Sequence, residues 1–191
     1  MTGASDRHEE IATNLLAILH SHLKGSGCRI YGSNLKIRVG DDFLYPDLFV
    51  RCATERGDPF FKTDPTLVIE VLSPSTRSYD RGDKRLVYQS LVTLQEYVLV
   101  TQDTPSVEIY RRPTDGWKRE TYQGPGESLS FQSVALDIEL SDALRKLTTD
   151  IGIISSSTFA FPRMKPCPSA NKPGPSRSPP PSAKMSCSCA P

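Results

Sequence analysis

The sequence predicts an α/β fold followed by a disordered C-terminal tail, on three observations. A helical pattern opens the chain, β-type segments with a second helix among them follow, and residues 148–191 change sharply in composition. A length of 191 residues with 37% hydrophobic and 24% charged residues suits one domain with a sizeable core. We therefore expect a domain over residues 1–147 and a Pro/Ser-rich tail over residues 148–191.

Residues 6–24 are expected to form an amphipathic helix. Asp6 is the predicted N-cap, with Glu9 three positions later at capping-box spacing. Gly25 is a natural end for the helix. The apolar residues recur at helical intervals on one stripe, namely Ile11, Leu15, Ile18, Leu19 and Leu23.

Strands are expected next. Residues 29–31 form a short one, and apolar and basic residues alternate through residues 35–39, which indicates a strand with one wet face. Turn chemistry at residues 40–42 predicts that residues 44–52 return as the partner strand. Because Pro46 removes one ladder donor, an edge or a bend is expected there.

The central strand is expected at residues 67–72, after a loop over residues 53–65. Its nearly continuous apolar run is typical of a strand covered on both faces. By strand alternation, Glu70 shares one face with Val68 and Leu72.

A second helix is predicted over residues 80–91, where Lys84 and Tyr88 lie four apart and share one side. The other expected elements are strands at residues 96–101, 107–111, 117–122 and 134–138 and a short helix that Ser141 caps and that runs to residue 147.

The charge is unevenly distributed along the chain. From Thr148 onward there are five of the 23 Lys and Arg and one of the 22 acids, so the preceding body carries 18 bases, 21 acids and a net charge of −3. That balance argues against a broad surface for coating nucleic acid and leaves room for a small basic cleft. No apolar run approaches the roughly 20 residues of a membrane helix, so no membrane partner is expected.

The tail and the cysteines set further expectations. Nine of the 16 prolines lie in residues 148–191, which cannot bury enough apolar surface to offset their ordering entropy. Cys28 and Cys52 lie near predicted strands, and the other three cysteines lie in the tail. Without zinc-ligand spacing or an N-terminal signal pattern, we expect reduced thiols and a cytoplasmic location.

Two carboxylates lie in apolar β-type segments, Asp47 directly after Pro46 and Glu70 inside the central strand. A half-buried carboxylate is costly without a compensating partner. If the two strands are neighbours and the side chains point the same way, they form a hard-oxygen site suited to Mg²⁺. The alternatives are a turn aspartate and a structural ion pair of Glu70 with Arg38 or Lys36.

A lysine that reaches these carboxylates would complete a centre for phosphodiester cleavage, and Lys84 is the candidate. The carboxylates would hold a metal that activates water, and the lysine would stabilise charge on the transition state. The carbonyl of Val71 is a candidate further oxygen ligand. Taken singly, Lys84, Asp80 and Tyr88 are more often a surface lysine, a helix-terminal charge and a packing residue.

Four blocks in this order resemble the Uma2 family: residues 45–50, 65–76, 79–84 and 96–100. The most specific is Glu-Val-Leu-Ser-Pro-Ser-Thr at residues 70–76, and the similarity spans residues 8–144. The family, formerly a domain of unknown function, belongs to the PD-(D/E)xK restriction-endonuclease-like superfamily. The resemblance implies a restriction-endonuclease-like α/β core with a mixed β-sheet flanked by helices.

The resemblance also implies an activity, which is Mg²⁺- or Mn²⁺-dependent hydrolysis of phosphodiester bonds in DNA. Asp47 matches the first acidic position and Glu70 the second. Leu72 stands where the superfamily has its usual lysine, and Lys84 on the following helix matches the role. His8, Asp80 and Tyr88 are expected supporting residues, and a homodimer is an open expectation because related nucleases often form symmetric dimers.

One departure keeps other functions open. Relatives carry a further N-terminal segment ahead of the helix with a histidine like His8, so the Uma2-like domain is expected to be N-terminally short. The alternatives are therefore a catalytically silent, nuclease-derived module that binds DNA or protein, and a truncated gene product without a stable fold.

Overall fold

The computed structural model describes residues 4–124 and 126–145, and its main feature is a six-stranded sheet in the order β1-β4-β6-β7-β8-β9. β6 and β7 are parallel and the other adjacent pairs are antiparallel, so the predicted mixed sheet is confirmed. The expected tail, residues 148–191, lies outside the described residues. The strands of this sheet are β1 (Arg29–Gly32), β4 (Leu48–Arg51), β6 (Leu67–Leu72), β7 (Glu96–Thr101), β8 (Ser106–Arg111) and β9 (Lys118–Gln123).

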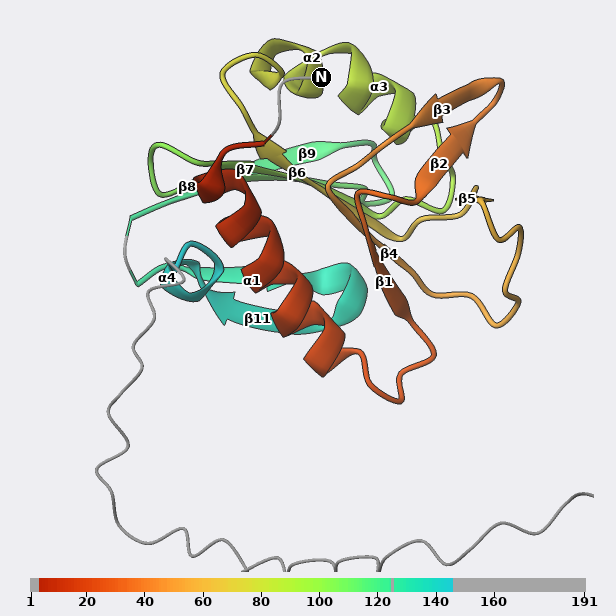
Figure 1. Ribbon diagram of the computed structural model, residues 1–191, viewed down its shortest axis with the longest axis horizontal. Coiled ribbons are helices and arrows are strands. Elements are labelled where there is room, and N and C mark those ends of the chain that lie inside the picture. The colour runs from red at the N-terminus through yellow and green to blue at the C-terminus, as the bar shows by residue number, and fades with distance from the viewer. Residues whose placement is uncertain (1–3, 125, 146–191) are drawn as a thin grey trace, which may run out of the picture. The chain divides into compact units, whose positions relative to one another are not determined.

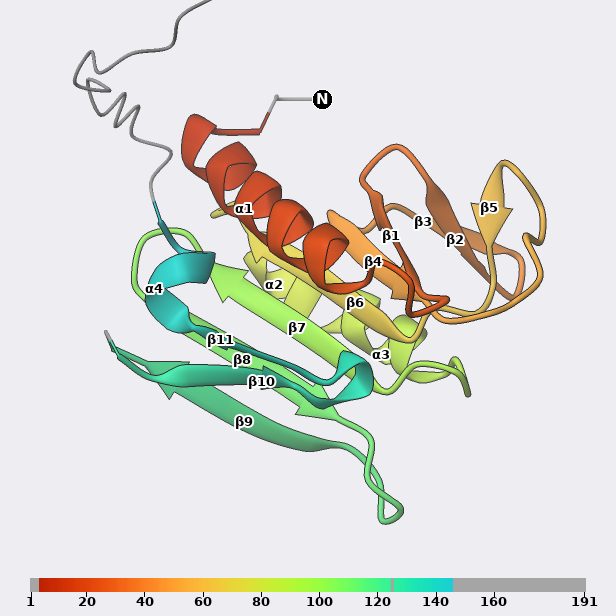
Figure 2. The same cartoon turned by 90° about the horizontal axis from the view of Figure 1, so that it is seen from below.

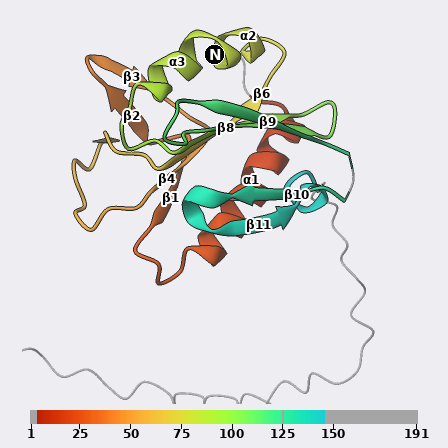
Figure 3. The same ribbon diagram turned by 180° about the vertical axis from the view of Figure 1, so that it is seen from behind.

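Helices cover both faces of this sheet (Figure 1). One face carries α2 (Arg77–Arg81) and α3 (Asp83–Gln89). The other carries α1 and the β10–β11 hairpin, which lie side by side (Figures 2 and 3). This second layer comprises α1 (Asp6–His22), β10 (Ser128–Phe131), η1 (Gln132–Val134), β11 (Leu136–Glu139) and α4 (Leu140–Ala143).

Two hydrophobic cores separate these layers, and β6 contributes to both. Leu67, Ile69 and Val71 pack in the core beneath α1. Val68 and Leu72 pack in the core that contains Tyr88 of α3. The predicted alternation of β6 is therefore confirmed, and Glu70 lies on the face toward α2 and α3.

The N-cap of α1 lies one residue earlier than predicted. The Ser5 hydroxyl accepts a hydrogen bond from the His8 backbone N–H at 3.2 Å, so Ser5 and not Asp6 is the N-cap. Asp6 becomes the first helical residue, where a carboxylate interacts favourably with the helix dipole. The buried stripe is confirmed at Ile11, Leu15 and Leu19.

The predicted strand over residues 44–52 is wrong as a single element. β3 (Asp42–Leu44) pairs with β2 (Lys36–Val39), which also pairs with β5 (Phe61–Lys62), and these three strands form a separate small sheet. β4 pairs instead with β1 and β6. The expected bend at Pro46 is confirmed, because the chain passes there from the small sheet to the main sheet.

Other predicted elements differ in detail. The single helix over residues 80–91 is two helices that meet at Gly82, a residue with low helix propensity. The strand expected at residues 134–138 is η1 followed by β11, and its partner β10 was not predicted. α4 begins at Leu140 without a side-chain cap, so the predicted Ser141 cap is wrong; residues 146–147 lie outside the described residues.

Cys28 and Cys52 form a disulfide, so the expectation of reduced thiols is wrong for this pair. The strand register explains the pairing. Arg29 of β1 lies opposite Arg51 of β4, so the two cysteines, one position further out, face each other. None of the helices described here is long and apolar enough to cross a bilayer.

Candidate active site

The two candidate carboxylates lie at the same end and on the same face of the main sheet. Leu48 of β4 is paired with Ile69 of β6, and extending this antiparallel register by one residue places Asp47 beside Glu70. By alternation Asp47 shares a face with Phe49, which packs in the same core as the β6 residue Val68. Both carboxylates therefore lie toward the α2–α3 layer, as predicted.

Lys84 reaches the carboxylates from α3. Its Nζ lies 2.8 Å from Glu70 Oε1 and 3.4 Å from Asp80 Oδ1, and it donates a hydrogen bond of 3.3 Å to the Tyr45 carbonyl. The partner of Glu70 is thus Lys84, and the alternative of an ion pair with Arg38 or Lys36 is wrong.

Burial dominates the electrostatics of this cluster. Glu70 is 3% exposed, and burial raises the pKa of its carboxyl to about 8. Lys84 opposes this rise, whereas Asp47 and Asp80 add to it. Burial lowers the pKa of Lys84, but Glu70, Asp80 and Asp47 together raise it by more than burial lowers it. The net pKa is above the ordinary value, so the ammonium stays charged at neutral pH.

Asp47 is held by two donors. Its Oδ2 accepts a hydrogen bond of 2.7 Å from the Val71 backbone N–H and lies 3.2 Å from His8 Nε2. The hydrogen bond to Asp47 is the main cause that raises the pKa of His8. α1 therefore contributes to the site through its first turn, although most of α1 packs on the opposite face of the sheet.

The carbonyl of Val71 points toward the same side as its N–H, because both groups of one residue face the same neighbouring strand. β4 pairs with β6 only as far as Ile69. The backbone of Val71 on this edge of β6 is therefore not paired with β4. The predicted carbonyl ligand thus faces the region that Asp47 occupies.

Tyr88 and Asp80 complete the surroundings. The Tyr88 hydroxyl is buried and has no hydrogen-bond partner among the described residues, and burial, followed by the nearby carboxylates, raises its pKa. Asp80 is 3% exposed. The Tyr97 hydroxyl donates to the Asp80 backbone carbonyl at 2.9 Å, and this positioning contact had no signal in the sequence beyond an aromatic residue in a strand.

The donor set fits a hard cation with few protein ligands. Within residues 4–124 and 126–145, no group of three or more His, Cys, Asp or Glu side chains is arranged to hold a metal. The Lys84 contact to Glu70 Oε1 is an ion pair outside hydrogen-bond geometry, and this buried oxygen has no other partner in that part of the chain. Mg²⁺ commonly uses one or two carboxylates together with water and substrate phosphates.

Comparison with known proteins identifies the family. A family model described as "Uma2: Putative restriction endonuclease" matches residues 1–145. The chain belongs to the Uma2 family. Among its relatives are two uncharacterized Synechocystis proteins. The Uma2 chain is 36% identical to slr1290 over 151 residues, which is 77% of the chain and 79% of that protein. It is 27% identical to sll1609 over 137 residues, 69% of the chain and 77% of that protein.

A solved structure from Anabaena variabilis, described as "a putative nuclease belonging to DUF820", shares the fold of this Uma2 protein. The TM-score is 0.63 at 20% identity, over 74% of this chain and 82% of that one. The predicted restriction-endonuclease-like α/β class is confirmed. Family and fold together make this a nuclease-like protein.

Proposed function

We propose that this Uma2 protein is a divalent-metal-dependent endonuclease that hydrolyses phosphodiester bonds in DNA. The observation that carries the proposal is the cluster of Asp47, Glu70 and Lys84 at one end of β6, in which Glu70 is buried and the other two are partly buried. A carboxylate whose pKa is raised to about 8 by burial, beside a charged lysine, is typical of a functional site.

Asp47, Glu70 and the Val71 carbonyl would hold Mg²⁺ or Mn²⁺. When bound, such an ion supplies a Lewis acid for the phosphate and lowers the pKa of attacking water. The two carboxylates also repel each other through a buried region, and a divalent cation between them would relieve that repulsion.

The protein's own groups have separate roles in this proposal. Lys84 keeps its positive charge, so it stabilises negative charge that develops on the phosphate oxygens. The Val71 N–H and His8 fix the orientation of Asp47. The buried Tyr88 hydroxyl is a spare donor toward the carboxylates or the substrate.

Nicking of supercoiled plasmid in Mg²⁺ or Mn²⁺ tests the proposal. We expect cleavage that EDTA abolishes and that Asp47→Ala or Glu70→Ala lowers by about 100-fold or more, as for loss of a main transition-state contact. Asp83→Asn is the matched control, because Asp83 is exposed, adjoins Lys84 in α3 and makes no ion pair among the described residues.

Two results would contradict the proposal. One is the absence of cleavage of any DNA form under varied metal conditions, and the other is cleavage that survives both alanine variants. DNA or protein binding that is unchanged by these variants, without cleavage, would identify the silent binding module instead.

A further inference from the structure

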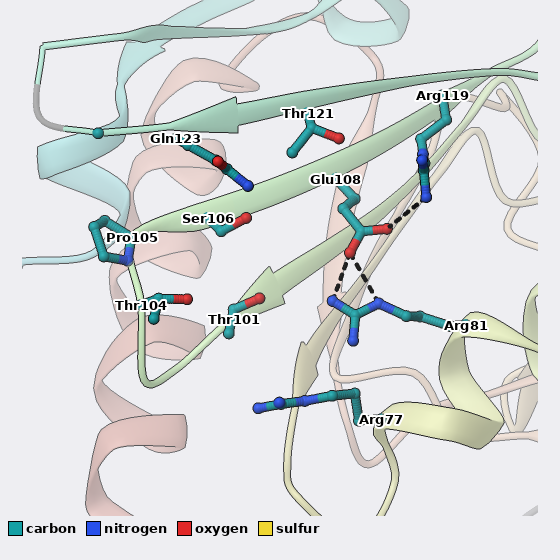
Figure 4. Close-up of a pocket in the computed structure, with 11 residues that line it drawn as sticks. Arg77, Arg81, Thr101, Thr104, Pro105, Ser106, Glu108, Arg119, Thr121 and Gln123 are labelled. Atoms are coloured by element: carbon teal, nitrogen blue, oxygen red, sulfur yellow. Dashed lines mark hydrogen bonds and ion pairs between the residues drawn. The ribbon is translucent and has the colours of Figure 1, made fainter.

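A polar groove of about 710 Å³ lies over β7, β8 and β9 beside α2 (Figure 4). Arg77 and Arg81 reach it from α2, and Arg119 and Glu108 from the sheet. Its other walls are hydroxyl, amide and backbone groups of Thr101, Thr104, Pro105, Ser106, Thr121, Gln123 and Gly124. None of the described residues that line it is aromatic.

The groove continues the face of the sheet that carries Glu70. In the strand registers Glu70 is paired with Leu99, Leu99 with Glu108, and Glu108 with Thr121. These residues form one row across the sheet. Adjacent strands lie about 4.8 Å apart, so the Glu70 and Glu108 backbones are separated by about 10 Å.

Glu108 positions one arginine without neutralising the groove. Its Oε1 accepts hydrogen bonds from Arg81 Nε at 2.8 Å and Nη2 at 2.5 Å. Arg81 Nη1 has no hydrogen-bond partner among the described residues. With three arginines and one carboxylate in its lining, the groove carries two excess positive charges, in a chain whose body is acidic.

The other two arginines are available to a ligand. Arg119 has 62% of its side chain exposed and lies 3.9 Å from Glu108 Oε2. Arg77 pairs at 3.1 Å with Asp103, whose side chain is 66% exposed, and such a surface pair is weak. Arg77 Nε is buried and has no hydrogen-bond partner in the described part of the chain.

We propose that this groove binds the sugar–phosphate backbone of a DNA strand on the same face of the sheet as the Asp47–Glu70 site. Arginine, hydroxyl and amide donors are the usual partners of backbone phosphates, and a groove without aromatic side chains offers no stacking surface for bases. The identification of the bound strand as DNA rests on the proposed nuclease function. Because the groove would contact the backbone and not the bases, binding by the groove is expected to be independent of base sequence.

The test is DNA binding by the full chain in EDTA, measured as fluorescence anisotropy of a labelled duplex at several salt concentrations. We expect Arg77→Ala/Arg119→Ala to weaken binding at least about 10-fold, and the salt slope to fall by about two, because each lost phosphate contact removes about 0.9 from the slope. Arg77→Lys/Arg119→Lys is expected to keep most of the affinity, because lysine keeps the positive charge. Retained affinity in this variant would show that the alanine variant loses binding through lost charge and not through misfolding.

Arg29→Ala is the matched control, because Arg29 is an exposed arginine on β1, the opposite edge strand of the same sheet. Wild-type affinity and salt slope in the double alanine variant would overturn the inference, as would binding of inorganic phosphate without binding of DNA. Binding that depends on these arginines without cleavage in Mg²⁺ would contradict the proposed nuclease alone. Cleavage with unchanged binding by the variant would contradict the groove alone.

Discussion

Glu70 and Glu96 are both buried carboxylates with a basic partner. They differ in how completely hydrogen bonds satisfy each carboxylate. Glu96 accepts hydrogen bonds from Arg111 Nε and from the backbone and hydroxyl of Ser133. Glu70 has the Lys84 ion pair alone among the described residues, and two further carboxylates lie near it. An incompletely satisfied buried charge lowers stability, which is typical of residues kept for chemistry.

The raised pKa of Glu70 predicts a pH-dependent stability. Its folded-state pKa of about 8 exceeds the ordinary value of 4.5, so the protonated carboxyl favours folding, and this contribution is lost as the pH rises between these values. In EDTA we expect Glu70→Gln to melt several °C above the wild type at pH 8, with a smaller difference at pH 5. Thermal unfolding at both pH values checks this.

Glu96→Gln is the matched control for that experiment. Because Glu96 is fully hydrogen-bonded, its loss is expected to lower the melting temperature at pH 8. A Glu70→Gln protein that is less stable than the wild type at pH 8 would show that the ion pair with Lys84 outweighs the burial of the carboxylate.

At the scale of single residues, the sequence predicted the site better than the groove. Glu70 was recognisable because a carboxylate interrupts a continuous apolar strand, and Asp47 because it follows Pro46 in a β-type segment. Lys84 followed from its place in the next helix. The groove could not be predicted, because Arg77 and Arg119 are far apart in the chain and each looks like an ordinary surface arginine.

At the scale of elements, the joint between α2 and α3 positions the cluster. α2 carries Asp80 and α3 carries Lys84, and Gly82 lies between them. A Cβ built on Gly82 would lie 3.0 Å from the backbone oxygen of Ser78. Since that oxygen is backbone of α2, relieving the contact requires the backbone at the joint between α2 and α3 to shift by a few tenths of an ångström.

Gly82→Ala is therefore expected to lower both stability and activity. The steric contact should cost about 1–3 kcal/mol, as for other overpacked sites, and the shift of Lys84 should slow nicking. Melting temperature and nicking rate are measured on the same preparation. Gly32→Ala is the control, because a Cβ there meets no atom within 4 Å. Equal effects of the two substitutions would contradict the proposed role of the joint.

The local sequence pattern predicted an element correctly where its residues follow one periodicity. It failed where one segment pairs with two different sheets. β6 has six consecutive buried residues and was placed correctly. Residues 44–52 were expected to form a single strand, yet the chain divides near Pro46 between the small and main sheets. This choice depends on long-range pairing of β4 with β1 and β6, which no short window of sequence contains.

At the scale of the whole molecule, the Cys28–Cys52 disulfide links the segment after α1 to the end of β4. The cysteines are 24 positions apart, and closing a loop of that size stabilises a protein by about 3 kcal/mol in the chain-entropy description. We expect reductant to lower the melting temperature by about 5–10 °C. Cys28→Ser/Cys52→Ser should melt at the lower temperature with or without reductant.

Thiol titration of the native protein gives an independent check. Cys28 and Cys52 are expected to be unreactive in the absence of reductant and to react after reduction. Five reactive thiols in the folded protein, or a melting temperature that reductant leaves unchanged, would mean that the pair is not bonded in solution.

The contacts around Asp47 also bear on when the site forms as the chain folds. His8 to Asp47 and Lys84 to the Tyr45 carbonyl each join residues 39 positions apart. Contacts between distant residues form slowly, because the entropy of closing the intervening chain opposes them until much of the structure is in place. A partly synthesised or partly folded chain therefore lacks His8 and Lys84 beside the carboxylates, and the proposed active site forms only when the domain has folded.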